Sequence, residues 1–358
     1  MSARRRRRVA VLGAGIGRQH LAALAATPDR FEVAALCDRD GARAAEALAT
    51  TGLRAPVVPE VDALIGDPSI DLVDVCLPPH LHVPVAQAAL AAGHHVVCEK
   101  PLASSPAEAD VLVAAARAAG RMLFPVFQYR YGLAMDQLRA LSEAGLTGRP
   151  FVASLETHWD RRGDYYAVHW RGTWSGENGG AVLGHAIHNH DLLAMLFGPV
   201  ETVSATVATR VNPIETEDCA AIAMTHRGGA VATSSVTLGA AGDTTRLRLC
   251  YARLTAESGA APYAPAEAPW RYLARDPADQ NAVDAVVASV RPGPAGFAGF
   301  FGAVADALDG DPARAVPAEA GRASIELVAA IYAAARTGAR VALPLARDHP
   351  FHGGWRPT

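Results

Sequence analysis

Short apolar runs alternate with alanine-rich stretches over the first 126 residues. The apolar runs predict buried strands at Arg8–Leu12, Glu32–Cys37, Pro56–Val58, Leu72–Leu77, His95–Cys98 and Met122–Val126. The stretches between them predict helices at Gly17–Ala26, Gly41–Ala49, Val61–Ile65, Val83–Ala92 and Pro106–Ala119. Buried strands that alternate with helices indicate a parallel sheet with helices on both faces. Residues 1–126 are therefore predicted to form a dinucleotide-binding type of domain.

The pattern changes after Phe127, where residues 127–358 are predicted to form a second α/β domain. Strands are expected at Arg149–Thr157, Thr202–Arg210, Asp218–Thr225, Gly229–Leu238, Arg246–Leu254 and Arg340–Leu343. Helices are expected at Ala134–Ala144, Gly180–Phe197, Phe297–Leu308 and Ala318–Arg336, and a loop at Pro262–Pro277. Strands that follow one another with few helices between them favour an open, mostly antiparallel sheet.

Composition excludes several classes of protein. The chain has 358 residues, is 50% hydrophobic and 19% charged, and carries a net charge of −3, so it offers no global field for nucleic acid. Its apolar runs are shorter than the roughly 20 residues that span a bilayer, so no membrane partner is expected. The five cysteines are odd in number and lack CxxC spacing, which is typical of a reducing cytoplasm.

A glycine-rich segment stands between the first predicted strand and the first predicted helix. Gly13, Gly15, Ile16 and Gly17 form a turn at which backbone amides and a helix N-terminus can bind a pyrophosphate. Asp38 ends the second strand about 20 residues later, where a carboxylate can hold both ribose hydroxyls of an adenosine and repel a 2′-phosphate. This favours NAD.

Arg39 keeps NADP open as an alternative, because a guanidinium beside Asp38 can cover a 2′-phosphate. Further along the chain, Pro78 and Glu99-Lys100 follow the fourth and fifth strands. Ligands bind beyond the carboxyl ends of the strands in an open parallel sheet, so these residues are expected at the same edge as the glycine turn.

Lys100 is the only lysine, beside 32 arginines. A codon bias towards arginine explains most of the missing lysines but not the one that remains at the end of a buried strand. An ammonium group can lose its proton when its pKa is lowered, whereas a guanidinium cannot. Lys100 is therefore a candidate catalytic residue.

Three histidines lie within six residues of the predicted helix Gly180–Phe197. On a regular helix His185 and His188 share a face, and Asp191 is placed to orient the His188 ring. An imidazole titrates near neutral pH and suits the transfer of a hydroxyl proton, so His188 is a candidate base. Packing at a domain interface is the alternative for these rings. A metal is not predicted, because the spacing lacks the i, i+4 pair of a helical zinc site.

Four motifs together resemble the glucose–fructose oxidoreductase/inositol dehydrogenase/MocA (Gfo/Idh/MocA) family. They are VLGAGIGRQH, LPPHLH at 77–82, AAGHHVVCEKPLA around Lys100, and the GG…HxxD segment that ends at Asp191. The resemblance covers nearly the whole chain. It implies a Rossmann domain followed by an α/β domain whose open sheet forms the interface of a homodimer or homotetramer.

The resemblance also implies roles for individual residues. Lys100 would contact the reacting hydroxyl and the nicotinamide ribose, His188 matches the catalytic histidine, and His82 and Glu99 would lie near the nicotinamide. Substrate contacts are implied at Gln128, His158, Asp160 and His185. Many members carry aspartate where this chain has Gly184. His185 or Asp191 would then compensate, or Lys100 would itself accept the proton.

These features predict an NAD-dependent oxidoreductase that transfers hydride between nicotinamide and a secondary hydroxyl of a sugar, cyclitol or related polyol. Three alternatives remain open. The first is an NADPH-dependent keto-sugar reductase of a biosynthetic pathway. The second is a lyase or glycosidase that oxidises its sugar transiently with bound NAD, and the third is a non-catalytic dinucleotide-sensing protein.

Overall fold

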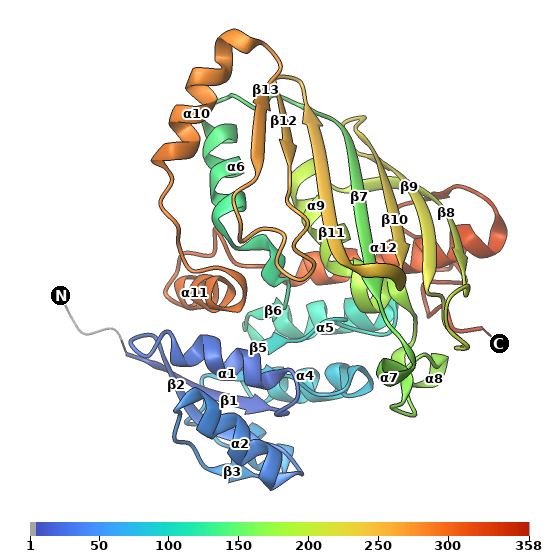
Figure 1. Ribbon diagram of the computed structural model, residues 1–358. Helices are drawn as coiled ribbons and strands as arrows, with labels where there is room; N and C mark the ends of the chain where they lie inside the picture. The colour runs from blue at the N-terminus through green and yellow to red at the C-terminus, as the bar shows by residue number, and fades with distance from the viewer. Residues whose placement is uncertain (1–4, 358) are drawn as a thin grey trace. The chain divides into compact units, whose positions relative to one another are not determined.

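The computed structural model describes residues 5–357, so the outermost residues of the two predicted domains, 1–4 and 358, lie outside it. The chain divides into two compact units, each built around its own sheet (Figure 1). The first unit contains the residues up to Phe127 together with Phe297–Ile325. The second contains Gln128–Gly296 and the residues from Glu326 onward.

A six-stranded parallel sheet forms the centre of the first unit. Its strands are β1 (Arg7–Leu12), β2 (Phe31–Cys37), β3 (Val57–Val58), β4 (Leu72–Val75), β5 (His95–Cys98) and β6 (Leu123–Pro125). Their spatial order is β3-β2-β1-β4-β5-β6, and every neighbouring pair is parallel. This order places the strand reversal between β1 and β4, as in doubly wound dinucleotide-binding domains. The predicted fold of this region is confirmed.

The helices of the first unit are α1 (Gly17–Ala25), α2 (Gly41–Thr51), α3 (Val61–Ile65), η1 (Pro79–Leu81), α4 (His82–Ala91), α5 (Pro106–Ala119) and α11 (Gly296–Leu308). Two of them, α2 and α5, begin at a residue whose side chain caps the helix. At the start of α5 the Ser105 side chain accepts from the Glu108 amide, and the Glu108 carboxylate accepts from the Ser104 amide. This reciprocal capping satisfies amides that the first helical turn leaves unpaired.

Residues 297–325 pack in the first unit, although the predicted boundary assigned them to the second domain. Phe301 lies edge-on to Phe31 with ring centroids 5.8 Å apart, and Arg30 forms ion pairs with Asp306 and Asp309. An apolar helical pattern predicts that a helix has a buried face, but not which sheet that face will cover. The helix α12 (Ala318–Thr337) continues from these residues into the second unit.

The second unit is built on an eight-stranded sheet in the order β13-β12-β11-β7-β10-β9-β8-β14. The strands are β7 (Pro150–Asp160), β8 (Val200–Ala208), β9 (Cys219–His226), β10 (Val231–Thr237), β11 (Gly239–Tyr251), β12 (Leu254–Glu257), β13 (Arg271–Ala274) and β14 (Val341–Ala342). β7 and β10 are parallel and the other neighbours are antiparallel, which confirms the predicted open, mostly antiparallel sheet. β13 lies inside the loop predicted at Pro262–Pro277.

One face of this sheet is buried and the other is open. Along β7, Ala153, Leu155, Thr157 and Trp159 are buried, and the residues between them are more exposed. This alternation is typical of a sheet with one covered face. The helical segments of the unit are η2 (Gln128–Arg130), α6 (Leu133–Glu143), α7 (Gly163–Tyr166), α8 (Trp174–Glu177), η3 (Val182–Ala186), α9 (Ile187–Phe197), η4 (Pro277–Asp279) and α10 (Gln280–Ser289).

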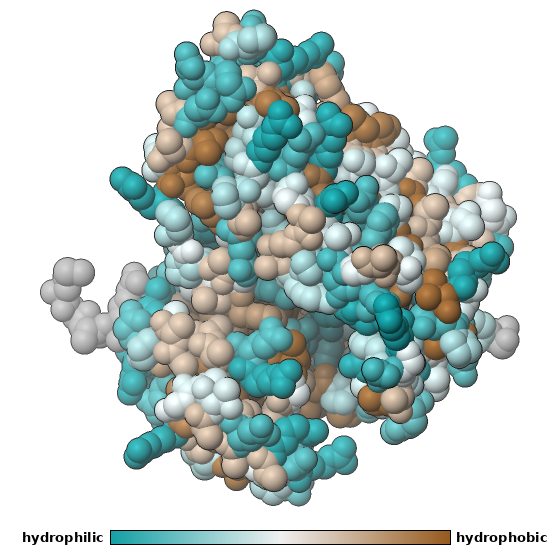
Figure 2. All heavy atoms as spheres, in the orientation of Figure 1, coloured by the Kyte–Doolittle hydropathy of each residue, from teal (hydrophilic) through white to brown (hydrophobic). Residues whose placement is uncertain are grey.

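The surface mixes hydrophilic and hydrophobic residues on the face that Figure 2 shows. Within residues 5–357 no helix combines the length and the apolar character that a bilayer span requires. All five cysteines are free, and Cys37, Cys76 and Cys98 are buried. These three therefore behave as small core residues, as the apolar runs around them predict.

Candidate active site

The glycine turn of the first unit is packed closely at Gly13 and open at Gly15. Gly13 has a φ of +99°, and a Cβ atom there would lie 2.5 Å from the Cys76 carbonyl oxygen. Gly15 and Ile16 are exposed at the N-terminus of α1, and a Cβ on Gly15 would meet nothing within 4 Å. The turn thus leaves open space in front of a helix N-terminus, where a pyrophosphate can be bound by backbone amides. These residues fit a dinucleotide.

Asp38 lies where the adenosine ribose is expected, at the end of β2. Its carboxylate accepts from the Ala14 amide at 2.8 Å, from the Asp40 amide at 2.8 Å and from the Arg43 guanidinium at 2.7 Å. Burial alone would raise the pKa of Asp38, but these hydrogen bonds outweigh it and hold the pKa below its usual range. Arg39 is exposed. The ion-pair partner of Asp38 is thus Arg43, a residue outside the predicted cofactor set.

The loops after β4 and β5 are joined by His82. One of its ring nitrogens lies 2.7 Å from the Leu77 carbonyl oxygen and the other lies 2.7 Å from that of Pro101. The side chain is 1% exposed, and burial lowers its pKa. Pro78, in the loop after β4, is exposed. His82 therefore fixes the edge of the expected cofactor site rather than presenting its ring there.

Lys100 is the second residue after β5 and is partly buried. Its backbone amide donates to the carboxylate of Glu99 at 2.9 Å. The other oxygen of that carboxylate lies 3.1 Å from a ring nitrogen of His20, which belongs to α1. His20 was not predicted as a site residue, although it ends the VLGAGIGRQH motif.

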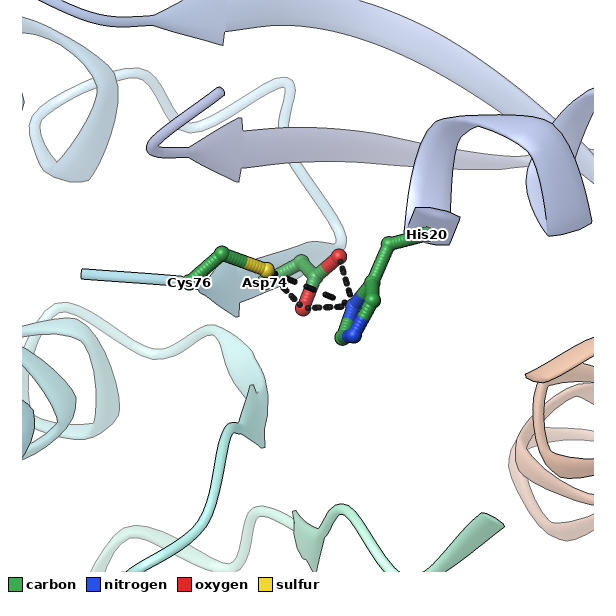
Figure 3. A group of neighbouring side chains, drawn as sticks. All are labelled: His20, Asp74 and Cys76. Carbon is green, nitrogen blue, oxygen red and sulfur yellow. Dashed lines mark hydrogen bonds and ion pairs between the residues drawn. The ribbon is translucent and has the colours of Figure 1, made fainter. Parts of the chain in front are cut away.

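His20 also belongs to the one group within residues 5–357 whose donor atoms lie close enough to share a metal ion. The group consists of His20, Asp74 and Cys76, with all donor atoms within 4.8 Å of one another (Figure 3). The histidines at 185, 188 and 190 form no such group. The predicted absence of a metal stays a prediction.

In the second unit the segment of the three histidines is not one regular helix. Residues Val182–Ala186 form a π-helical turn, and α9 begins at Ile187. Such turns are rare and are frequently found at functional sites. The predicted helix over Gly180–Phe197 is thus present, but it contains a π-helical turn, because sequence periodicity does not reveal an inserted residue in a helical turn.

The start of this segment is held by a buried carboxylate. Glu217 accepts from the Val182 amide at 2.9 Å and from the Tyr332 hydroxyl at 2.8 Å, and the Gly180 amide lies 3.1 Å from it. A Cβ on Gly180 would lie 1.9 Å from the Glu217 carbonyl oxygen, so no larger residue fits there. Burial raises the pKa of Glu217 to about 7, against the lowering effect of its hydrogen bonds.

His188 and Asp191 are each contacted from η2. The Tyr129 ring stacks on His188 with centroids 4.7 Å apart and an interplanar angle of 27°. Arg130 donates two hydrogen bonds to Asp191, at 2.6 and 2.7 Å, and both side chains are largely buried. Both carboxylate oxygens of Asp191 thus accept from Arg130. The prediction that Asp191 orients His188 did not include this ion pair.

His185 lies against aromatic side chains that the sequence analysis did not assign to the site. Trp159 is edge-on to it at 5.2 Å, and the Tyr165 ring is 5.9 Å away. Arg161 lies over Trp159 and Tyr165 at 5.1 and 5.4 Å and forms an ion pair with Asp243 at 3.0 Å.

His158 is not brought together with His185. Its ring bonds the Ser235 hydroxyl at 2.9 Å on the open face of the sheet, whereas Trp159 points to the covered face. Asp160 follows the same alternation as His158, and its carboxylate bonds Arg162 at 2.8 Å. Because side chains alternate along a strand, an uncertainty of one residue moves a prediction to the other face.

The remaining predicted residues are placed as follows. Gln128 is partly buried in η2. His190 is 2% exposed and bonds the Ser234 hydroxyl at 2.9 Å, and burial lowers its pKa to about 4. His190 is therefore a core histidine.

Comparison with known proteins extends the resemblance to both units. The model of the GFO/IDH/MocA oxidoreductase family, NAD-binding Rossmann fold, matches residues 7–127. The model of the GFO/IDH/MocA C-terminal domain matches residues 135–257. The crystal structure of the WlbA dehydrogenase from Bordetella pertussis, in complex with NADH and UDP-GlcNAcA, is similar with a TM-score of 0.81 and 30% identity. That match covers 96% of this chain and 100% of the other.

Curated relatives match over shorter stretches. The uncharacterized oxidoreductase C115.03 of Schizosaccharomyces pombe is 31% identical over 59% of this chain and 58% of its own length. Inositol 2-dehydrogenase of Acidothermus cellulolyticus is 37% identical over 41% of this chain and 44% of its own length. The chain thus matches only 58% of the length of the first of these relatives. Together, the two family models and the full-length structural match show that the chain belongs to the Gfo/Idh/MocA oxidoreductase family, with an NAD-binding Rossmann fold in its first unit.

Proposed function

We propose that the protein is an NAD-dependent dehydrogenase that oxidises a secondary hydroxyl of a sugar, cyclitol or related polyol. The observation that carries this proposal is the pair of chemically suited side chains, one in each unit. Lys100 follows β5 at the carboxyl edge of the NAD-binding sheet, and His188 stands just after a π-helical turn, stacked on Tyr129. Relatives named for inositol and levoglucosan dehydrogenation support the substrate class.

Residues of the first unit would hold NAD. Backbone amides around Gly15 and the N-terminus of α1 would bind the pyrophosphate, and the Asp38 carboxylate would accept from the ribose hydroxyls. Bound NAD would supply the redox chemistry by accepting a hydride from the carbon that carries the reacting hydroxyl. We favour NAD over NADP because an ionised Asp38 repels a 2′-phosphate.

In the proposed mechanism His188 accepts the proton of the substrate hydroxyl. Stacking on Tyr129 orients the ring, so that its nitrogens are presented in a fixed plane. The Lys100 ammonium stabilises the negative charge that develops on the oxygen as the proton leaves. In the reverse direction a keto sugar would take a hydride at its carbonyl carbon from NADH, His188 would return the proton to the oxygen, and Lys100 would again stabilise the charge on that oxygen. The alternative in which Lys100 itself accepts the proton makes His188 dispensable, and substitution of His188 separates the two.

For substrate binding we retain Gln128 and His185 and replace His158 by Tyr165. Trp159 and Tyr165 both lie against His185, but Trp159 is buried, whereas Tyr165 is partly exposed and is the aromatic side chain proposed to pack on the apolar face of a sugar ring. For His158 and Asp160, a substrate contact is supported only by the family resemblance. We further propose a cytoplasmic location, from the unpaired cysteines, and, on the resemblance alone, a homodimer or homotetramer.

The test is a substrate panel assayed for NADH and NADPH formation. It contains myo-inositol, free hexoses, an anhydro sugar and UDP-linked sugars with and without a carboxylate, the last group because the WlbA structure holds UDP-GlcNAcA. The His188→Asn variant is the control for background reduction. NADH formation from one class, absent in the variant, supports the proposal. Tightly held NAD without net NADH formation contradicts it and favours transient redox in a lyase or glycosidase.

A further inference from the structure

His20 occupies a sealed position behind the glycine turn. It follows Gly17 by one turn of α1, and its side chain is 0% exposed, as is that of Asp74 in β4. Two rings of α11 lie against the imidazole, Phe297 at 4.7 Å and Phe301 at 5.5 Å between centroids. A polar side chain this deeply buried requires partners, because an unpaired polar group is costly away from water.

Carboxylates face both nitrogens of the His20 ring. Nδ1 lies 2.9 Å from Asp74, a contact that Figure 3 shows, and Nε2 lies 3.1 Å from Glu99. An ionised carboxylate only accepts hydrogen bonds, so the ring satisfies both when each nitrogen carries a proton. Burial lowers the pKa of His20, but the negative charge and hydrogen bond of Asp74 outweigh it and the pKa is raised well above its usual value.

Glu99 connects this buried cation to Lys100. One oxygen of its carboxylate faces His20 and the other accepts from the Lys100 backbone amide at 2.9 Å. Glu99 is only 5% exposed, so the position of its carboxylate depends on the groups that bond it. Loss of the His20 ring would remove one of the contacts that hold this carboxylate against the Lys100 amide.

We propose that His20 is a positioning residue of the reaction: together with Asp74 it holds the Glu99 carboxylate against the Lys100 amide and thereby fixes the turn that presents the Lys100 ammonium group. This inference rests on the proposed function, in which that ammonium stabilises the developing charge on oxygen. His20 acts through Glu99 and Lys100, because its fully buried ring cannot reach a substrate.

A metal site is the competing interpretation of the same cluster. The Cys76 sulfur lies 3.3 Å from His20 Nδ1 and 3.5 Å from Asp74. A metal would require a thiolate at Cys76 and an unprotonated Nδ1. Burial raises the pKa of the Cys76 thiol, and Nδ1 already bonds Asp74. These observations favour a hydrogen-bonded network.

Because Lys100 is the only lysine, its environment can be measured without any substrate. Amine-selective labelling of the full chain is followed over pH by mass spectrometry of the peptide that contains Lys100, in the wild type and in His20→Gln. The matched control is His94→Gln. His94 is another buried histidine of the first unit, and its nitrogens bond the Ile70 and Ile65 carbonyl oxygens at 2.9 and 2.7 Å.

The expected result is a severalfold faster labelling of Lys100 in His20→Gln and a wild-type rate in His94→Gln. Asp74→Asn keeps the shape of the side chain and is expected to change the labelling rate in the same direction. The test therefore still decides the inference if His20→Gln does not fold. An unchanged rate in both His20→Gln and Asp74→Asn, or an equal change in His94→Gln, overturns the inference. A stoichiometric metal bound by the wild type and lost in His20→Gln also overturns it.

Turnover then separates this inference from the proposed function. With a substrate from the panel, His20→Gln should lower kcat by roughly 10- to 100-fold, as expected for a misplaced catalytic group. The KM for NAD should change less than kcat, because the fully buried His20 ring is not available to a bound cofactor. If no panel substrate reacts, the proposed function fails, but the labelling result still decides whether His20 positions Lys100.

Discussion

Tyr129 stacks on His188, with ring centroids 4.7 Å apart and planes inclined by 27°. The two residues come from separate segments of the second unit, η2 and α9. The contact holds the imidazole from one side. The hydroxyl of Tyr129 lies 3.5 Å from the Pro262 carbonyl oxygen, and this long hydrogen bond contributes little to holding the tyrosine ring. The face of the tyrosine ring, rather than its hydroxyl, is therefore the part that orients the proposed base.

This contact predicts that Tyr129→Phe is nearly silent and Tyr129→Ala is not. Aromatic stacking contributes about 0.5–1.5 kcal/mol, so its loss should lower kcat by roughly 2- to 10-fold. The KM for NAD should be unchanged in both variants. Steady-state kinetics on a substrate from the panel check this, and equal activity of the alanine variant would show that the stack does not position His188.

Substitution of the two proposed catalytic groups should affect kcat far more than stacking does. His188→Asn removes the proton acceptor and should lower kcat by roughly 10²- to 10⁴-fold. Lys100→Arg keeps the positive charge but changes its shape and should also lose most activity. Calorimetric binding of NAD to each variant provides the control for folding.

Amine-selective modification should inactivate the wild type, with protection by NAD plus substrate. Lys100 is the only lysine, so the side chain modified is known in advance. Lys100→Arg should be insensitive to the reagent in whatever activity it retains. Full turnover by enzyme labelled stoichiometrically at Lys100 would contradict the proposed mechanism.

Cofactor preference should depend on the ion pair between Asp38 and Arg43. Asp38→Ser removes the acceptor for the ribose hydroxyls and releases the Arg43 guanidinium, which now bonds Asp38 at 2.7 Å. We expect NAD to bind about tenfold or more weakly, since a charged hydrogen bond contributes about 1.5–3 kcal/mol, and NADP to gain relative to NAD. Titration with both dinucleotides measures this. In the double variant Asp38→Ser/Arg43→Ala the gain for NADP should disappear.

Glu217 should make stability depend on pH. Its pKa is about 7 in the folded protein, above the 4.5 of an unperturbed glutamate, because the carboxyl is buried. The folded state therefore holds the proton more tightly than the unfolded chain. Its contribution to stability is complete below about pH 4.5 and is lost as pH rises to about 7, a decline of ~3 kcal/mol.

The comparison of wild type with Glu217→Gln isolates this contribution, since other titrating groups are shared. Urea unfolding at several pH values should show that the wild type loses more stability than the variant between pH 5 and 7. Identical pH dependence in the two proteins would mean that Glu217 titrates normally. The π-helical turn that Glu217 holds should also loosen on substitution, which hydrogen exchange at Val182 can follow.

The sequence predicted most elements of the fold because their signals are local. β5 at His95–Cys98 and α5 at Pro106–Ala119 have the predicted bounds, since an apolar run and a capping motif are visible in a few residues. β13 was missed because four residues, Arg271–Ala274, give too short a pattern among prolines. β13 forms a strand because it pairs with β12 in the folded sheet, and this pairing leaves no local pattern in the sequence.

The chemical identity of the candidate site was also determined by the sequence: the glycine turn, Asp38, the solitary Lys100 and the histidine segment could be named from residue type and order. Only the tertiary structure decided which partner each has. It paired Asp38 with Arg43 and Asp191 with Arg130, put Tyr129 on His188, and turned Trp159 rather than His158 towards His185. Hydrogen bonds and ring contacts join residues far apart in the chain, and their geometry depends on packing that no local pattern encodes.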